Sequence, residues 1–130
     1  MIFFGHRFID SENMYHIQSI DAIQNTPPSS IIYLNFHEEN LDVIKHGVVN
    51  GIRVALHVDN ITELVYANAL DVSYIVVKKD LAKTAQDLAQ NYLFDAKILV
   101  TVENEDEIEE LALLGLDGVI FSNAIIKINS

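Results

Sequence analysis

The stretch AKILVTVENEDEIEELALLGLDGVIFSN, residues 96–123, decides the fold class of this chain. Residues 96–102 are mostly apolar and rich in β-branched side chains, which is typical of a strand buried on both faces. Asn104 and Glu107 have the spacing of a capping box, and apolar residues then recur at helical spacing up to Gly115. A second buried strand is predicted at residues 119–121. The order of strand, helix and strand predicts a βαβ unit, in which the two strands are parallel.

The same alternation runs through the rest of the chain. Strands are predicted at residues 2–4, 31–36, 52–58, 72–77, 96–102 and 119–121. Helices are predicted at residues 15–24, 41–49, 60–70, 81–93 and 105–114, and residues 125–130 are expected to be a short terminal extension. The break at residues 26–30, which contains two prolines, is too short for a domain linker. We therefore expect a single α/β domain over residues 1–130, with a parallel sheet that is either curled toward a barrel or open and doubly wound in three layers.

The composition limits the classes of protein to which this chain can belong. The chain has 130 residues, half of them hydrophobic, which is enough for one sizeable core. Its formal net charge of −11 disfavours binding to nucleic acid or anionic membranes, because both need a basic surface. No apolar run approaches the roughly 18–20 residues of a membrane span, and cysteine is absent. We expect a cytoplasmic protein with no membrane span and no nucleic-acid partner.

Polar side chains collect where the predicted strands end. The carboxyl ends of parallel strands meet at one edge of the sheet, where this class of fold places its sites. The candidates along this edge are His6, Arg7, Asn35, His37, His57, Asp59, Lys78, Lys79, Thr101, Glu103, Ser122 and Asn123. Such residues can hold a phosphate and transfer protons. The alternative is that strand ends are polar because they meet solvent, and that residues such as Asp59 and Asp80 cap helices. The other histidines, His16 and His46, fall in predicted helices.

His6 and Arg7 differ from the other candidates. This bulky polar pair comes directly behind the first buried strand, and the sequence offers no capping or packing role for it. We therefore predict that His6 and Arg7 are catalytic. His37 has a structural alternative at its strand end, and Lys78 with Lys79 has the alternative of a solvated surface pair.

The run Gly5-His6-Arg7, followed by Glu12-Asn13, resembles the opening of the glycerophosphodiester phosphodiesterases. Residues 100–104 and 107–120 resemble the last two βα units of the same family. The resemblance implies a (β/α) barrel and hydrolysis of a glycerol phosphodiester. It also implies that His6 acts as acid or base on the bridging phosphate, that Arg7 binds this phosphate, and that Glu12 takes the place of the family's loop glutamate.

The chain departs from this family in several ways. It is shorter, Phe8 replaces the glycine that follows Gly-His-Arg, and the family's Glu-x-Asp metal pair has no clear counterpart. We therefore expect a truncated TIM-barrel-like sheet of about six βα units. The metal ligands are unknown, and the sequence leaves open whether a divalent ion such as Mg²⁺ or Ca²⁺ is a cofactor. A shortened barrel has two open edges and an uncovered core, which predicts a homodimer.

Three functions are consistent with these residues. The first is a phosphodiesterase-like hydrolase that acts on or binds a small phosphorylated ligand, such as a glycerol phosphodiester. Beside the catalytic pair, the residues expected to bind its substrate are Glu12, His37, His57, Asp59 and Lys78. The second function is a non-catalytic module for a phosphate ligand or a protein partner, which has lost the metal site. The third is a phosphosugar lyase or isomerase that forms a Schiff base at Lys78.

Overall fold

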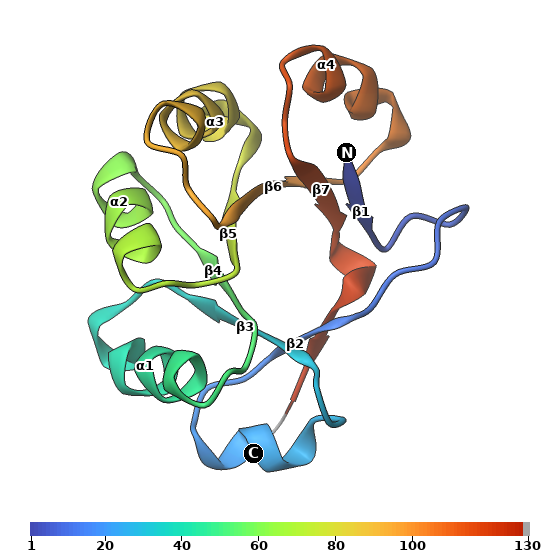
Figure 1. The fold of residues 1–130 in the computed structure, drawn as a ribbon. Coiled ribbons are helices and arrows are strands. Elements are labelled where there is room, and N and C mark those ends of the chain that lie inside the picture. The colour runs from blue at the N-terminus through green and yellow to red at the C-terminus, as the bar shows by residue number, and fades with distance from the viewer. Residues whose placement is uncertain (129–130) are drawn as a thin grey trace.

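The computed structural model describes residues 1–128, and in it eight parallel strands form one sheet (Figure 1). The strands are β1 (Ile2–Phe4), β2 (Met14–His16), β3 (Ile31–Asn35), β4 (Val54–His57), β5 (Tyr74–Val77), β6 (Lys97–Val102), β7 (Gly118–Phe121) and β8 (Ile125–Lys127). Their order across the sheet is β1-β7-β6-β5-β4-β3-β2-β8. The sheet curls into an open half-barrel that resembles a TIM barrel, so the predicted α/β class and parallel sheet are confirmed.

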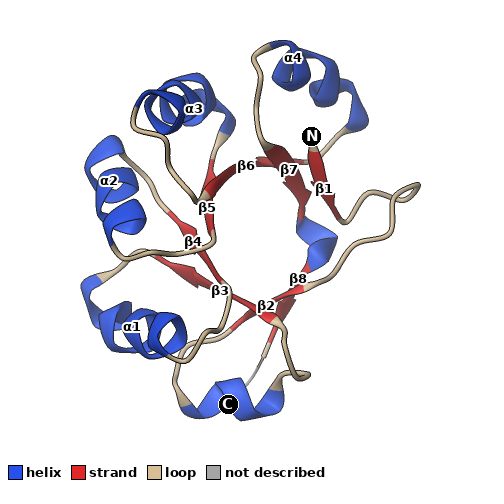
Figure 2. Ribbon diagram, viewed as in Figure 1, coloured by secondary structure: helices blue, strands red, loops and turns tan. Residues whose placement is uncertain are grey.

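All the α-helices lie on the outer side of the curled sheet (Figure 2). They are α1 (Leu41–Val49), α2 (Ile61–Ala69), α3 (Ala82–Asn91) and α4 (Ile108–Leu113). The doubly wound alternative is therefore wrong, because it requires helices on both faces of the sheet. No helix among residues 1–128 is both long enough and apolar enough to cross a membrane.

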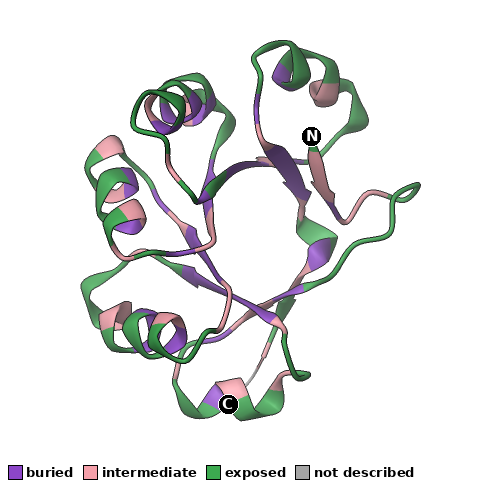
Figure 3. Ribbon diagram, in the orientation of Figure 1, coloured by how far each residue is buried: buried purple, intermediate pink, exposed green. Residues whose placement is uncertain are grey.

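The outer face of the sheet and the helices enclose the larger apolar core, which includes Ile44, Leu64, Ile98 and Leu111. The inner face of the sheet has a second apolar cluster of its own, which we call the inner cluster. Its buried members are Phe4, Met14, Ile31, Tyr33, Ala55, Val76, Leu99, Ile120 and Ala124. Figure 3 shows that the strands of the curled sheet are largely buried.

The inner cluster changes the argument for a homodimer. Seven of its nine buried members have no exposed surface, and Phe4 and Tyr33 are only 5% and 6% exposed. The curled sheet therefore covers its own inner face within one chain. The expectation of an uncovered core is wrong, and the homodimer stays a prediction without that support.

The prediction of a helix at residues 15–24 is also wrong. Met14–His16 forms β2, which lies between β3 and β8 with parallel partners on both sides, and only Asp21–Asn25 forms a short 3-10 helix. The segment has apolar residues at helical spacing, but Met14 belongs to the inner cluster and Ile17 to the outer core. A strand sends neighbouring side chains to opposite faces, so pairing with β3 and β8 overrides the local helical pattern.

The C-terminal segment supplies two strands instead of one. β7 pairs with β1 and β6, and β8, three residues further on, pairs with β2. The expected terminal extension is therefore partly wrong, because residues 125–127 are a strand; residues 129–130 lie outside the described part of the chain. Gly118 allows β1 to approach closely, since a Cβ at this position would lie 2.7 Å from the carbonyl oxygen of Ile2 and 2.7 Å from Leu99 Cδ2.

Candidate functional site at the carboxyl ends of the strands

Six polar side chains face inward at the carboxyl ends of the strands, directly above the inner cluster. Side chains alternate between the two faces of a strand, so a residue two positions beyond a member of the inner cluster shares its face. This rule selects His16, Asn35, His57, Lys78, Thr101 and Lys127. It does not extend to His6 or Ser122, because the positive φ of Gly5 and the 3-10 helix that begins at Ser122 interrupt the alternation. Lys127 is included because Ile125 packs against the inner cluster. We call these six residues the inner rim.

The strand register makes four members of the inner rim neighbours, in two pairs. His16 is the register partner of Lys127, and Asn35 is the register partner of His57. A hollow of about 300 Å³ opens beside His16 and Asn35, and Glu39 and Asn40 also line it. Four inner-rim residues, Asn35, His57, Lys78 and Thr101, were expected at this edge from the sequence, and the strand alternation places them on one face of the sheet.

Both histidines of the inner rim are partly buried. Burial lowers the pKa of His16 below its ordinary value of 6.5, and the nearby Lys127 lowers it further. Burial also lowers the pKa of His57, against the opposing effect of Asp59, while Lys78 adds to the lowering. Neutral imidazoles are therefore favoured at this rim, and each has a nitrogen that can accept a proton.

Tyr33 lies just below the inner rim, in the inner cluster. Its ring is 5.2 Å from that of His16, centroid to centroid, and burial together with the charge of Asp59 raises the pKa of Tyr33 to about 12. Asp59 is exposed, and its Oδ1 lies 3.7 Å from His57 Nδ1, an ion-pair distance beyond hydrogen-bond range. Asp59 therefore influences both Tyr33 and His57.

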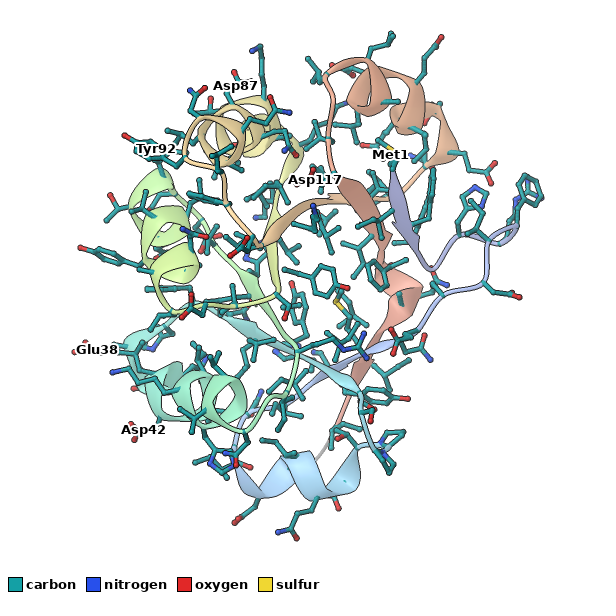
Figure 4. All side chains as sticks on the ribbon, viewed as in Figure 1. Met1, Glu38, Asp42, Asp87, Tyr92 and Asp117 are labelled. Carbon is teal, nitrogen blue, oxygen red and sulfur yellow. The ribbon has the colours of Figure 1, made fainter. Side chains whose placement is uncertain are left out.

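The lysines of the inner rim differ from most of the other cations. Arg7, Arg53, Lys79 and Lys83 form ion pairs with carboxylates. Within the described part of the chain, Lys78 and Lys127 form neither an ion pair nor a hydrogen bond. Glu38, Asp42 and Asp87, which are labelled in Figure 4, point outward instead. The inner rim therefore offers two free positive charges in a chain that is otherwise strongly acidic.

His6 and Arg7 form a separate group with Glu105, which we call the clamp. The Nε and Nη2 atoms of Arg7 donate to the two carboxylate oxygens of Glu105 at 2.8 and 3.1 Å. His6 Nε2 lies 3.0 Å from the same carboxylate. The carboxylate raises the pKa of Arg7, and the guanidinium group in turn lowers the pKa of Glu105. The clamp joins the N-terminal loop to the segment after β6.

Both ring nitrogens of His6 are engaged in the clamp. The backbone N–H of Phe8 donates to Nδ1 at 3.1 Å, which places the proton of a neutral ring on Nε2, facing Glu105. The imidazole has edge contacts with Phe3, Phe8 and Phe121, and its side chain is only 9% exposed. These contacts give His6 a structural role in packing and hydrogen bonding, which the sequence did not suggest.

The clamp borders a hollow of about 420 Å³, which is also lined by Asn123, Asn104 and Glu103. Asn123 donates from Nδ2 to the carbonyl of Gly5 at 3.0 Å, so the predicted edge residues do meet here. Two carboxylates line this hollow, Glu103 and Glu105, and the guanidinium group that lines it belongs to Arg7, which Glu105 already neutralises. The hollow is therefore a poorer place for an anion than the inner rim.

Two of the other expected binding residues lie away from both groups. Glu12 is at the opposite, amino-terminal edge of the strands, where its carboxylate accepts two hydrogen bonds from Arg53 at 2.7 and 2.8 Å. The structure therefore does not bring Glu12 to His6 and Arg7. His37 stands at the expected edge, but it is exposed and its Nδ1 accepts the N–H of Glu39 at 3.1 Å, a local helix cap.

Sequence reasoning missed four residues of these groups. His16 was assigned to a helix, Lys127 to a terminal extension, Tyr33 to a buried strand, and Glu105 to a solvated helix face. The alternation of Met14 with His16 and of Ile125 with Lys127 was the signal that could have found the first two. Across residues 1–128, no three His, Asp or Glu side chains come together in a way that could hold a metal ion.

No protein-family model matches this chain, and no curated protein is significantly similar to it. What is established is therefore the curled α/β fold and the geometry of the inner rim and the clamp.

Proposed function

We propose that this protein binds a small phosphorylated molecule at the inner rim. The observation that carries the proposal is the position of Lys78 and Lys127, two cations without an ion pair in a chain of net charge −11. Unpaired ammonium groups beside a partly buried polar surface suit a phosphate, which takes charge-assisted hydrogen bonds from lysine. The two lysines stand on opposite sides of the rim, since β4, β3 and β2 lie between β5 and β8 in the sheet.

The other members of the inner rim complete this proposal. Asn35 and Thr101 can donate and accept hydrogen bonds, so they suit the hydroxyl groups of a small polyol or sugar. His16 and His57 add neutral donors and acceptors at neutral pH. The carboxyl ends of the strands are also the usual location of ligands in barrels of parallel strands. The ligand is thus a phosphate joined to a small hydroxylated carbon chain.

The resemblance to the glycerophosphodiester phosphodiesterases supports the same ligand class. It rests on Gly5-His6-Arg7 and on the closing segment, and it suggests a glycerol phosphate as the first ligand to test. Hydrolysis is less well supported than binding, because Glu105 engages both His6 and Arg7. Catalysis by His6 would require the clamp to open. We therefore favour ligand binding over phosphodiester hydrolysis, and we propose the inner rim as the binding site.

Isothermal titration calorimetry with glycerol 3-phosphate tests this function, with glycerol as the matched compound without a phosphate. We expect saturable binding of glycerol 3-phosphate and none of glycerol. Each of Lys78→Met and Lys127→Met should weaken binding about tenfold, because losing one charge-assisted contact costs about 1.5 kcal/mol.

Lys97→Met is the matched control for these variants. It removes the same charge from an exposed, unpaired lysine at the amino-terminal end of β6, on the opposite edge of the sheet. We expect it to leave the affinity unchanged. Equal weakening by all three variants would mean a diffuse charge effect, and absence of binding to the wild-type protein would refute the proposal.

A further inference from the structure

Tyr33 is unusual among the residues of the inner cluster, because it carries a polar group into an otherwise apolar surface. The residue is 6% exposed, and its hydroxyl forms no hydrogen bond with a described residue. Buried tyrosine hydroxyls usually find a partner. No side-chain nitrogen or oxygen of the described residues is both fully buried and unbonded, so the Tyr33 hydroxyl keeps some solvent-accessible surface. It is therefore available to a ligand held at the inner rim.

His57 is a diagonal neighbour of Tyr33 on the same face of the sheet. Tyr33 is the register partner of Ala55, and His57 is two residues further along β4. The side chain of His57 is 13% exposed, Asp59 stands at its Nδ1, and its Nε2 has no hydrogen bond within residues 1–128. Asp59 also acts on Tyr33. A free imidazole nitrogen and a free phenol thus belong to diagonal neighbours on one face of the sheet, and the carboxylate of Asp59 acts on both groups.

These two groups have complementary proton chemistry. Burial favours the neutral form of His57, so its Nε2 can take a proton near neutral pH. The phenol of Tyr33 keeps its proton, because its pKa is raised to about 12. One group can therefore accept a proton while the other donates a hydrogen bond or a proton to an oxygen. Removal of a proton from the carbon beside a carbonyl group requires these two roles, a base for the C–H proton and an acid at the carbonyl oxygen.

We propose that the inner rim catalyses proton transfer at the carbon beside the carbonyl group of a phosphorylated hydroxycarbonyl compound, with His57 as base and Tyr33 as acid. The inference rests on the proposed function, since Lys78 and Lys127 hold the phosphate. In the forward step the C–H bond breaks and its proton goes to His57 Nε2. The electron pair forms a C=C bond while the carbonyl oxygen takes the proton of Tyr33, which gives an enediol. The reverse step returns both protons, and no oxidant or reductant takes part.

Deuterium exchange tests this step directly. The protein is incubated in D₂O with dihydroxyacetone phosphate, and proton NMR follows loss of the C–H signal of the hydroxymethyl carbon. We expect the wild-type protein to accelerate exchange over buffer alone. Tyr33→Phe and His57→Gln should each slow this exchange by about 100-fold or more, the usual effect of losing one acid or base. Binding of dihydroxyacetone phosphate to each variant is measured separately by calorimetry.

Tyr92→Phe and His46→Gln are the matched controls, because both residues are exposed and lie on helices or their ends. They should exchange deuterium at the wild-type rate. A wild-type protein that binds dihydroxyacetone phosphate without exchanging deuterium overturns the inference and leaves the binding function standing. Failure to bind either phosphate compound overturns both proposals. Undiminished exchange in a folded Tyr33→Phe variant, checked by circular dichroism, removes Tyr33 from the mechanism.

Discussion

His6, His16 and His57 are the same residue type in three different surroundings. His6 is enclosed by aromatic rings and has partners at both nitrogens. His16 has a ring contact with Tyr33 and no hydrogen bond of its side chain in the described part of the chain, and His57 has only the distant carboxylate of Asp59. The first arrangement holds the chain together, while the other two leave nitrogens free. Position relative to the curled sheet therefore separates a structural histidine from a candidate base.

The histidines of the inner rim make the stability of the fold depend on pH. The folded-state pKa values of His16 and His57 lie below 6.5, so the unfolded chain takes up protons first as the pH falls. Their contribution to the free energy of unfolding is complete above pH 6.5 and is lost as the pH falls through the lowered folded-state values. We expect the thermal midpoint to fall between about pH 7 and about pH 5.

The variant that carries both His16→Gln and His57→Gln is the comparison for this prediction, since it should show a smaller fall over the same range. The carboxylates Glu12, Glu105 and Glu107 do not interfere, because their folded-state pKa values are lowered from 4.5 and act only at more acidic pH. The same pH dependence in both proteins would show that other groups are responsible.

At the scale of single elements, local capping marks where the helices begin. The predicted capping pairs are confirmed at both places. Asn60 Oδ1 accepts the N–H of Glu63 at 2.9 Å, and Glu63 accepts the N–H of Asp59 at 2.9 Å. The capping box of Asn104 and Glu107 opens the segment that leads into α4. These caps come directly after β4 and β6, so they also fix the start of the loops that border the inner rim and the clamp.

The cap of α2 gives a prediction for one element. Asn60→Ala removes the acceptor for the N–H of Glu63 and should lower the free energy of unfolding by about 1 kcal/mol. Urea denaturation followed by circular dichroism measures this loss. Asn60→Ser is the matched control, because serine caps a helix in the same way, and it should retain most of the stability. Equal loss in both variants would mean that Asn60 contributes by something other than its cap.

At the scale of the whole molecule, the two ends of the chain are joined by the same C-terminal segment. β7 pairs with the N-terminal strand β1, and β8 pairs with β2. The clamp adds a contact between Arg7 and Glu105, 98 residues apart in sequence. Gln86, which is 2% exposed, accepts the N–H of Asp117 at 2.9 Å and so ties α3 to the turn before β7. These contacts join distant parts of the chain, so loss of one strand should disturb the packing of the others.

We therefore predict that the chain unfolds in one cooperative transition. Far-ultraviolet circular dichroism and tyrosine fluorescence should give the same urea midpoint. Gly118→Ala, which places a Cβ against β1 and Leu99, should move both midpoints down together, by roughly 1–3 kcal/mol in the free energy of unfolding. Two separated transitions, or a variant that moves only one probe, would show that β1 and β7 form a unit apart from the rest.

Part of the candidate site was readable from the sequence. The edge of the sheet was predicted from the order of strands and helices, and His57, Asp59 and Lys78 lie at that edge. The pairing of Arg7 with Glu105 was not predictable, because it joins residues from opposite ends of the chain. The position of Glu12 was missed for a related reason. The loop that follows β1 has no helix and carries Glu12 to the amino-terminal edge, where Arg53 binds it.

The sequence by itself determined the elements whose signals are local. Apolar runs, helical spacing and capping pairs indicated β1, the strands from β3 to β7 and the helices α1 to α4, because these signals depend on residues a few positions apart. Only the tertiary structure decided that β2 and β8 are strands, that the sheet curls, and that His16, Tyr33 and Lys127 share one face of the sheet with His57 and Lys78. Those outcomes depend on strand pairing between distant segments, which buries the inner cluster and overrides the local pattern of the chain.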